Sequence, residues 1–124
     1  MATSLLVRDE SLSGEVSHEF ELTFESETVT VHEIIRSRVY QEVSDYNAGV
    51  STKFQGLVQP QGSTVVKDGY LLKERRLIDW NEQFERALEA FRAGRIIVIV
   101  GERQVESLDE QVTLRAGAHV SFLR

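Results

Sequence analysis

The chain has 124 residues, of which 41% are hydrophobic and 27% are charged, as is typical of one folded globular domain. Its 14 lysines and arginines stand against 20 aspartates and glutamates, and the resulting net charge of −6 disfavours nucleic-acid binding because phosphates would be repelled. The absence of cysteine excludes disulfides, thiolate metal sites and cysteine nucleophiles.

Membrane and export signals are weak in this sequence. The longest apolar run, residues 96–100, is far too short to cross a bilayer. Residues 1–7 lack both the basic start and the long apolar stretch of a signal peptide. The densest basic cluster, Lys73 with Arg75 and Arg76, is too short to indicate a nucleic-acid site. We therefore expect a cytoplasmic protein that binds neither membrane nor nucleic acid.

The first predicted elements form a hairpin. An apolar run at residues 4–8 predicts a strand, and turn-forming residues follow as far as Gly14. Residues 18–25 then alternate, with Phe20, Leu22 and Phe24 on one side and polar side chains on the other. A period of two is typical of a strand with one buried and one exposed face. Two such runs joined by a short polar connection predict an antiparallel hairpin.

A helix is predicted next. Thr30 and Glu33 have the spacing of a capping box, in which each side chain reaches the other residue's backbone N–H. Apolar residues follow at intervals of four and form one face of a helix running to about Asp45. These residues are Val31, Ile35, Val39 and Val43. The segment from Asn47 to Gly49 would end the helix.

The region after this helix is less regular until a second helix begins. Residues 54–59 and 69–72 are each expected to form a short strand. Asp79 is a suitable N-cap for a helix over residues 80–93, and Gly94 supplies the left-handed conformation that commonly ends one. The apolar stripe of this helix comprises Trp80, Phe84, Ala87, Leu88 and Phe91.

The last thirty residues are predicted to be extended. The β-branched run at 95–100 predicts a strand buried on both faces. A brief strand at 104–105 and extended segments at 112–114 and 118–123 follow. Helices and strands are thus segregated along the chain, which predicts an α+β fold.

No reactive side chains have the spacing of a known catalytic or metal site. The three histidines, His18, His32 and His119, do not have metal-ligand spacing. The acidic residues of segment 19–27 alternate with apolar ones, as on a solvated strand face, and a glycosidase-type acid pair would require two of them to converge across a cleft.

Other enzyme motifs are missing as well. The glycines form no phosphate-binding loop, and no serine lies in a Gly-x-Ser-x-Gly elbow. The aromatic residues of segment 80–91 have helical spacing, which favours a core over a ligand-binding box. We therefore expect no catalytic residue, no metal and no cofactor, and a function that lies in a surface or a chain end.

Both ends of the chain resemble a family. Residues 95–110 are similar to the middle of a ubiquitin-like β-grasp domain, in which an apolar strand leads through a Gly-Lys-Gln-Leu-type turn to a leucine followed by an acid. Residues 118–124 resemble the final strand, which in ubiquitin also ends in a leucine-arginine pair. The hairpin followed by residues 28–35 resembles the start of the family's helix.

The resemblance implies one ubiquitin-like β-grasp domain over residues 1–124, with an insertion at about 47–94 between the helix and the third strand. It is closest to small bacterial ubiquitin-like proteins encoded beside an activating enzyme, and it extends to the sulfur carriers of the superfamily. This fold expectation fails if residues 18–25 are helical or if the last strand pairs with neither half of the hairpin.

The resemblance also implies a function. Members that act covalently extend past the last strand to Gly-Gly, and an ATP-dependent E1-like enzyme adenylates the terminal carboxylate. The acyl group then passes to a thiol and on to an amine or a sulfur. A conjugating enzyme and a deconjugating peptidase are further partners. The leading hypothesis is therefore a protein modifier or carrier whose tail lies beyond Arg124.

Under this hypothesis the partner-facing patch comprises the outward residues of the last strand, namely His119, Ser121 and Leu123, together with Arg124. An ordinary solvated sheet face explains the same residues equally well. Two other functions remain open. The first is a noncovalent adaptor that uses sheet edges or the second helix for association. The second is an enzyme, which a deep pocket lined by acids or histidines would indicate.

Overall fold

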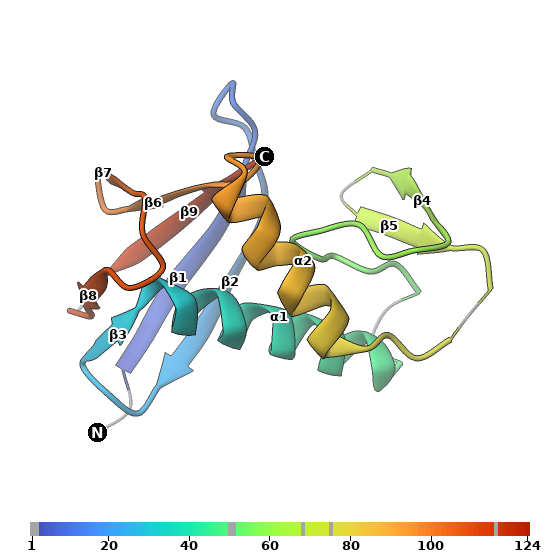
Figure 1. Ribbon diagram of the computed structural model, residues 1–124, viewed down its shortest axis with the longest axis horizontal. Coiled ribbons are helices and arrows are strands. Elements are labelled where there is room, and N and C mark those ends of the chain that lie inside the picture. Colours follow the sequence, from blue (N-terminus) through green and yellow to red (C-terminus); the bar gives the residue numbers. More distant parts are fainter. Residues whose placement is uncertain (1–2, 50–51, 68, 75, 116) are drawn as a thin grey trace. The chain divides into compact units, whose positions relative to one another are not determined.

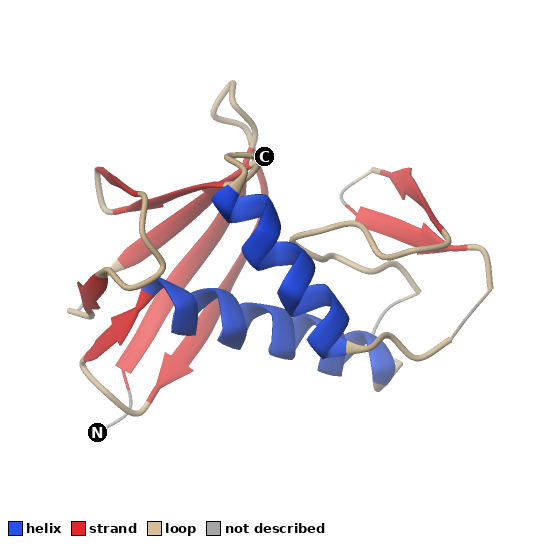
Figure 2. Cartoon of the chain, viewed as in Figure 1, coloured by secondary structure: helices blue, strands red, loops and turns tan. Residues whose placement is uncertain are grey.

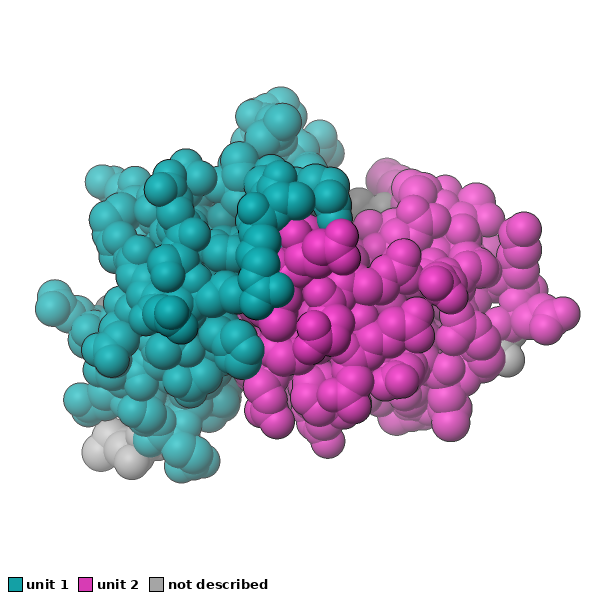
Figure 3. All heavy atoms as spheres, in the orientation of Figure 1, with its two compact units in different colours: residues 1–34, 91–124 teal, residues 35–90 magenta. Residues whose placement is uncertain are grey.

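A computed structural model describes residues 3–49, 52–67, 69–74, 76–115 and 117–124. The chain divides into two compact units (Figure 3). Unit 1 comprises residues 1–34 and 91–124, and unit 2 comprises residues 35–90. The two ends of the chain therefore fold together, and the middle of the chain forms a separate unit.

Unit 1 contains most of the strands (Figures 1 and 2). Its strands are β1 (Thr3–Glu10), β2 (Val16–Phe24), β3 (Thr28–Thr30), β6 (Ile97–Val100), β7 (Arg103–Val105), β8 (Gln111–Thr113) and β9 (His119–Leu123). The helix α1 (Val31–Asn47) begins in unit 1 and continues into unit 2, whereas α2 (Trp80–Arg92) begins in unit 2 and its last two residues belong to unit 1.

The main sheet of unit 1 has five strands in the order β2-β1-β9-β6-β7. β1 and β2 form an antiparallel hairpin, as predicted, with Leu5 opposite Leu22. β9 lies between β1 and β6, parallel to β1 and antiparallel to β6. The sheet is therefore mixed, and its central parallel pair joins the first and last strands of the chain. Together with the two helices this is an α+β fold, as the sequence predicted.

Alternate side chains of the main sheet form the core of unit 1. Val7, Val120 and Val98 lie on one face of three neighbouring strands, and each is completely buried. Phe122 is also completely buried, whereas Leu22 is 3% exposed. We call this the inner face. β2 is an edge strand, and of its three predicted inward residues Leu22 is buried while Phe20 and Phe24 are half-buried.

A second, two-stranded sheet of β3 and β8 positions the start of α1. The capping box predicted there is present: the Glu33 N–H donates to Thr30 Oγ1 at 3.1 Å, and the Thr30 N–H donates to Glu33 Oε1 at 3.4 Å. Two further N–H groups of the first turn also find acceptors, because Val31 donates to Glu110 O and His32 to Leu108 O, each at 3.0 Å. The first turn of the helix is thus held by hydrogen bonds to residues of unit 1.

Within unit 2, α1 carries a buried ion pair that holds a neighbouring loop. Arg38 is completely buried, and its Nε lies 3.2 Å from Glu42 Oε2. The other carboxylate oxygen of Glu42 accepts the N–H of Leu57 at 3.0 Å. Asn47, in the last turn of α1, exchanges two hydrogen bonds with the backbone of Ile78, at 2.8 and 3.0 Å. These contacts hold both the 54–58 and the 76–79 segments of unit 2.

The second helix and the small hairpin complete unit 2. Asp79 caps α2, as predicted, because its Oδ1 accepts the Asn81 N–H at 3.0 Å. Gly94 has a φ of 76° at the end of that helix, as expected for a left-handed terminator. β4 (Ser63–Val66) pairs with β5 (Gly69–Leu72) in an antiparallel two-stranded sheet.

Two strand predictions differ from the structure. Residues 54–59 do not form a strand, because only Phe54 forms a β-bridge, to Tyr70. The Phe54 ring lies instead against Gly56, where a side chain would clash with it. The strand predicted at 95–100 begins at Ile97 and is not buried on both faces, because Val98 alone is completely buried and its other three residues are half-buried. β3 and β4 were not predicted, since three or four residues are too few to show a period. Arg75 of the basic cluster lies outside the described residues.

Candidate functional site: the outer face of the five-stranded sheet

The candidate site is the face of the main sheet opposite the buried core. Backbone pairing places Leu6 beside His119, Arg8 beside Ser121, and Glu10 beside Leu123. On the other side of β9, Ile99 lies beside Ser121 and Ile97 beside Leu123. We call this set the outer face; it comprises Leu6, Arg8, Glu10, Ile97, Ile99, His119, Ser121 and Leu123.

Three of the four predicted site residues share this face. His119, Ser121 and Leu123 follow one another along one side of β9, while the side chains of Val120 and Phe122 are completely buried on the other. Ser121 is only 7% exposed, which is less than expected for an outward residue of an edge strand. The reason is that β9 is a central strand, so side chains of β1 and β6 flank Ser121 on both sides.

The fourth predicted residue, Arg124, lies elsewhere. Its guanidinium Nη2 is 3.6 Å from Oδ2 of Asp9, whose side chain alternates with the outer residues of β1 and is 2% exposed. The ion pair joins the residue after β9 to the end of β1, next to the core. Because a guanidinium that compensates a buried carboxylate is costly to remove, Arg124 has a structural role at this position.

The outer face is apolar at its centre and charged on the side of β2. Half-buried Leu6, Ile97, Ile99 and Leu123 supply the apolar centre. The polar side chains of β2 border it, and Arg8 Nε lies 2.8 Å from Glu19 Oε2 in an ion pair whose side chains are 40% and 49% exposed. A central apolar area with a polar rim is the usual composition of a protein-binding surface.

The other sequence candidates do not assemble into a reactive site. No group of three or more histidine or acidic side chains that could hold a metal ion occurs within the described residues. The imidazole of His18 stacks at 4.9 Å on Phe20, and the acids of β2 lie on its exposed side. Trp80 of α2 packs against Tyr40 and Phe84 at centroid distances of 5.5 and 5.8 Å, as part of an aromatic cluster rather than a ligand box.

The residues that sequence reasoning missed are those contributed by neighbouring strands. Leu6 and Arg8 belong to a strand that was predicted, and their alternation with Leu5 and Val7 was visible. Ile99 belongs to the strand that was predicted to be buried on both faces, but it lies half-buried on the outer face. Only the order of the strands in space shows that these side chains surround Ser121.

Comparisons with known proteins give this chain no relative: neither a family model, nor a curated protein sequence, nor a solved structure matches it. Within the described part of the chain, neither helix is long and apolar enough to cross a membrane.

Proposed function

We propose that this chain is a ubiquitin-like protein of the β-grasp fold that acts as a modifier or carrier. The observation that carries the proposal is the position of β9, which pairs in parallel with β1 at the centre of the sheet. The resemblance required that the last strand pair with the hairpin and that residues 18–25 be extended, and β2 spans most of that range.

The division of the chain supports the same proposal. Unit 1 contains residues 1–34 and 91–124, which include all but residue 35 of the segments that resemble the family. Unit 2, residues 35–90, overlaps the segment proposed as an insertion at about 47–94. An insertion that folds as its own compact unit leaves the pairing of the first and last strands unaffected, because both of its ends return to unit 1.

The proposed chemistry takes place on a tail that follows Arg124. The terminal carboxylate attacks the α-phosphorus of ATP on an E1-like partner, and an acyl-adenylate forms as pyrophosphate leaves. A partner thiolate then attacks the acyl carbon and releases AMP. Finally an amine attacks the thioester carbonyl and releases the thiol; in the carrier form hydrosulfide attacks instead, which leaves a thiocarboxylate and the same free thiol. Glycines suit such a tail because side chains would obstruct a narrow active-site channel. In this proposal the folded chain performs no catalysis and works in the cytoplasm.

A noncovalent adaptor is the second candidate, and the outer face is the observation that favours it. Leu6, Ile97, Ile99 and Leu123 form an apolar area on neighbouring strands, and such an area can bind a protein partner without any tail. Both candidates use the same face for recognition. They differ only in whether a covalent adduct forms.

The test is the intact mass and C-terminal sequence of the protein isolated from the cells that produce it. The modifier or carrier function predicts a chain that continues past Arg124 to a diglycine, free or joined to other proteins. A protein that ends at Arg124, with no adduct detected after denaturing purification, contradicts covalent chemistry and leaves the adaptor.

A further inference from the structure

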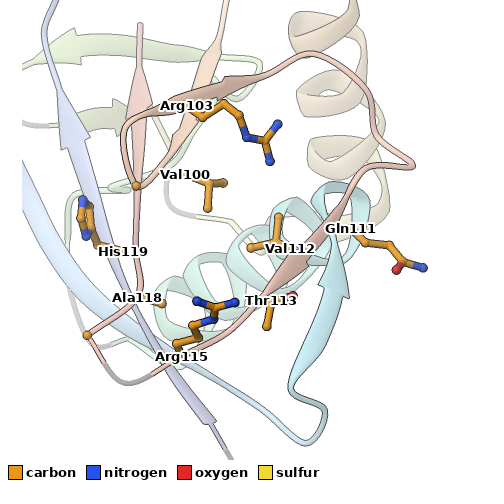
Figure 4. A pocket seen from close by; sticks show the side chains of 10 residues that line it. Val100, Arg103, Gln111, Val112, Thr113, Arg115, Ala118 and His119 are labelled. Carbon is orange, nitrogen blue, oxygen red and sulfur yellow. The ribbon is translucent and has the colours of Figure 1, made fainter.

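A hollow of about 570 Å³ lies within unit 1, where the β6–β7 turn, β8 and the loop before β9 meet (Figure 4). All three residues of β8 line it, together with Val100, Arg103, Arg115 and His119 among others. It lies at one end of the main sheet and shares only His119 with the outer face. The hollow is open, which suits a segment of chain lying along it better than an enclosed small molecule.

The walls of this hollow carry positive charge although the protein as a whole is negative. Arg103 and Arg115 line it, and none of its lining residues is acidic. The two arginines come from opposite sides of the hollow, with Val100 and Val112 between them (Figure 4). Arg103 forms an ion pair with Glu110, the residue before β8, yet the Arg103 side chain remains 64% exposed. Arg115 is exposed and forms no ion pair with any described residue.

The backbone of β8 adds a second binding element. β8 pairs with β3 along one edge, and within the described chain no strand pairs with its other edge. An extended peptide can add to such an edge through main-chain hydrogen bonds, with specificity coming from its alternate side chains. Half-buried Val100 offers an apolar contact between the two guanidinium groups, whereas Val112 is 3% exposed and forms the floor. Arginine forks match carboxylates in shape and charge.

We infer that this hollow binds an extended, acidic peptide segment of a protein partner. Carboxylates of the segment pair with Arg103 and Arg115, and an aliphatic side chain between them contacts half-buried Val100. The net charge of −6 does not prevent this, because at physiological salt charges more than about 8 Å away are largely screened. The inference requires no covalent chemistry, so it can hold whether or not the chain has a diglycine tail.

The experiment measures fluorescence anisotropy of a labelled peptide of alternating glutamate and valine, roughly eight residues long to match a strand. We expect saturable binding that weakens as salt rises, and an Arg115→Glu variant that binds at least about tenfold more weakly, as for loss of one charged hydrogen bond. The matched control is Lys73→Glu, which changes the net charge equally but lies in the loop after β5 in unit 2. A peptide of alternating glutamine and valine is the second control.

Amide chemical shifts in the full chain locate the site. Titration with the acidic peptide should shift the signals of Thr113, Arg115 and Gly117, and Arg115→Gln should weaken binding if the glutamate variant fails to fold. Equal loss with Lys73→Glu, equal binding of the glutamine peptide, or shifts confined to other segments would each overturn the inference. So would saturable binding of inorganic phosphate at these residues without peptide binding, which would make the hollow a phosphate site.

Discussion

Replacing Arg38 by methionine should destabilise unit 2 strongly. The Arg38 side chain is completely buried and that of Glu42 is 9% exposed, and their 3.2 Å ion pair spans one turn of α1. An exposed pair with this spacing contributes only about 0.3–0.5 kcal/mol. Removing one partner of a buried pair instead leaves an uncompensated charge and costs about 3–5 kcal/mol. The larger figure applies here, because Glu42 also accepts the N–H of Leu57 and cannot turn to solvent without losing that bond.

The assay is urea unfolding followed by the fluorescence of Trp80, the only tryptophan of the chain, which lies in unit 2. A double variant, Arg38→Met with Glu42→Gln, separates the charge from the packing. Its amide oxygen can still accept the Leu57 N–H, so we expect it to recover at least about 2 kcal/mol of the loss in unfolding free energy.

The control is Arg86→Met, which removes an ion pair with Glu82. The two residues are also four positions apart in a helix, but their side chains are more exposed and the N–O distance is 4.0 Å. It should lower the free energy of unfolding by less than about 1 kcal/mol. An equally small loss for Arg38→Met, or a double variant no more stable than the single one, would refute the claim that burial makes the Arg38 pair costly to break.

Three further predictions test the outer face and the packing of unit 2. Leu123→Glu should weaken capture of the protein's own partners in a pull-down while the circular dichroism spectrum and melting temperature stay close to those of the parent; an unfolded variant would show that Leu123 belongs to the core. Gly56→Ala should lower the free energy of unfolding by about 1–3 kcal/mol, since a Cβ there would clash with the Phe54 ring. Unchanged stability in urea would contradict that contact. Asn47→Ala removes both hydrogen bonds to the Ile78 backbone and should cost about 1–3 kcal/mol by Trp fluorescence, whereas a loss below about 0.5 kcal/mol would show that water replaces them.

Local signals were sufficient to predict most elements. The capping box of Thr30 and Glu33 and the cap at Asp79 each involve residues a few positions apart, so their spacing alone indicated where a helix begins. The alternation around Leu22 likewise indicated a strand. Arg38 shows where this reasoning stops: a charged residue in a helix gives no local sign that it will be completely buried beside Glu42.

The candidate site was predicted only in part, because local patterns again could not show contacts between distant residues. Alternation along the last strand correctly separated His119, Ser121 and Leu123 from the buried residues between them. It could not show that Ser121 would be 7% exposed or that Arg124 would reach Asp9, because both depend on β1, more than a hundred residues earlier in the chain. The hollow beside Arg103 and Arg115 was not predicted, since its walls come from three separate segments.

The sequence by itself determined the α+β class, both helices with their caps, and the hairpin, since backbone hydrogen bonding and side-chain period act over a few residues. Tertiary structure alone decided that β9 inserts between β1 and β6, which residues surround Ser121, and that Arg103 and Arg115 line one hollow. Those outcomes depend on contacts between residues far apart in the chain. The pattern of any one segment does not indicate which other segments lie beside it in the fold.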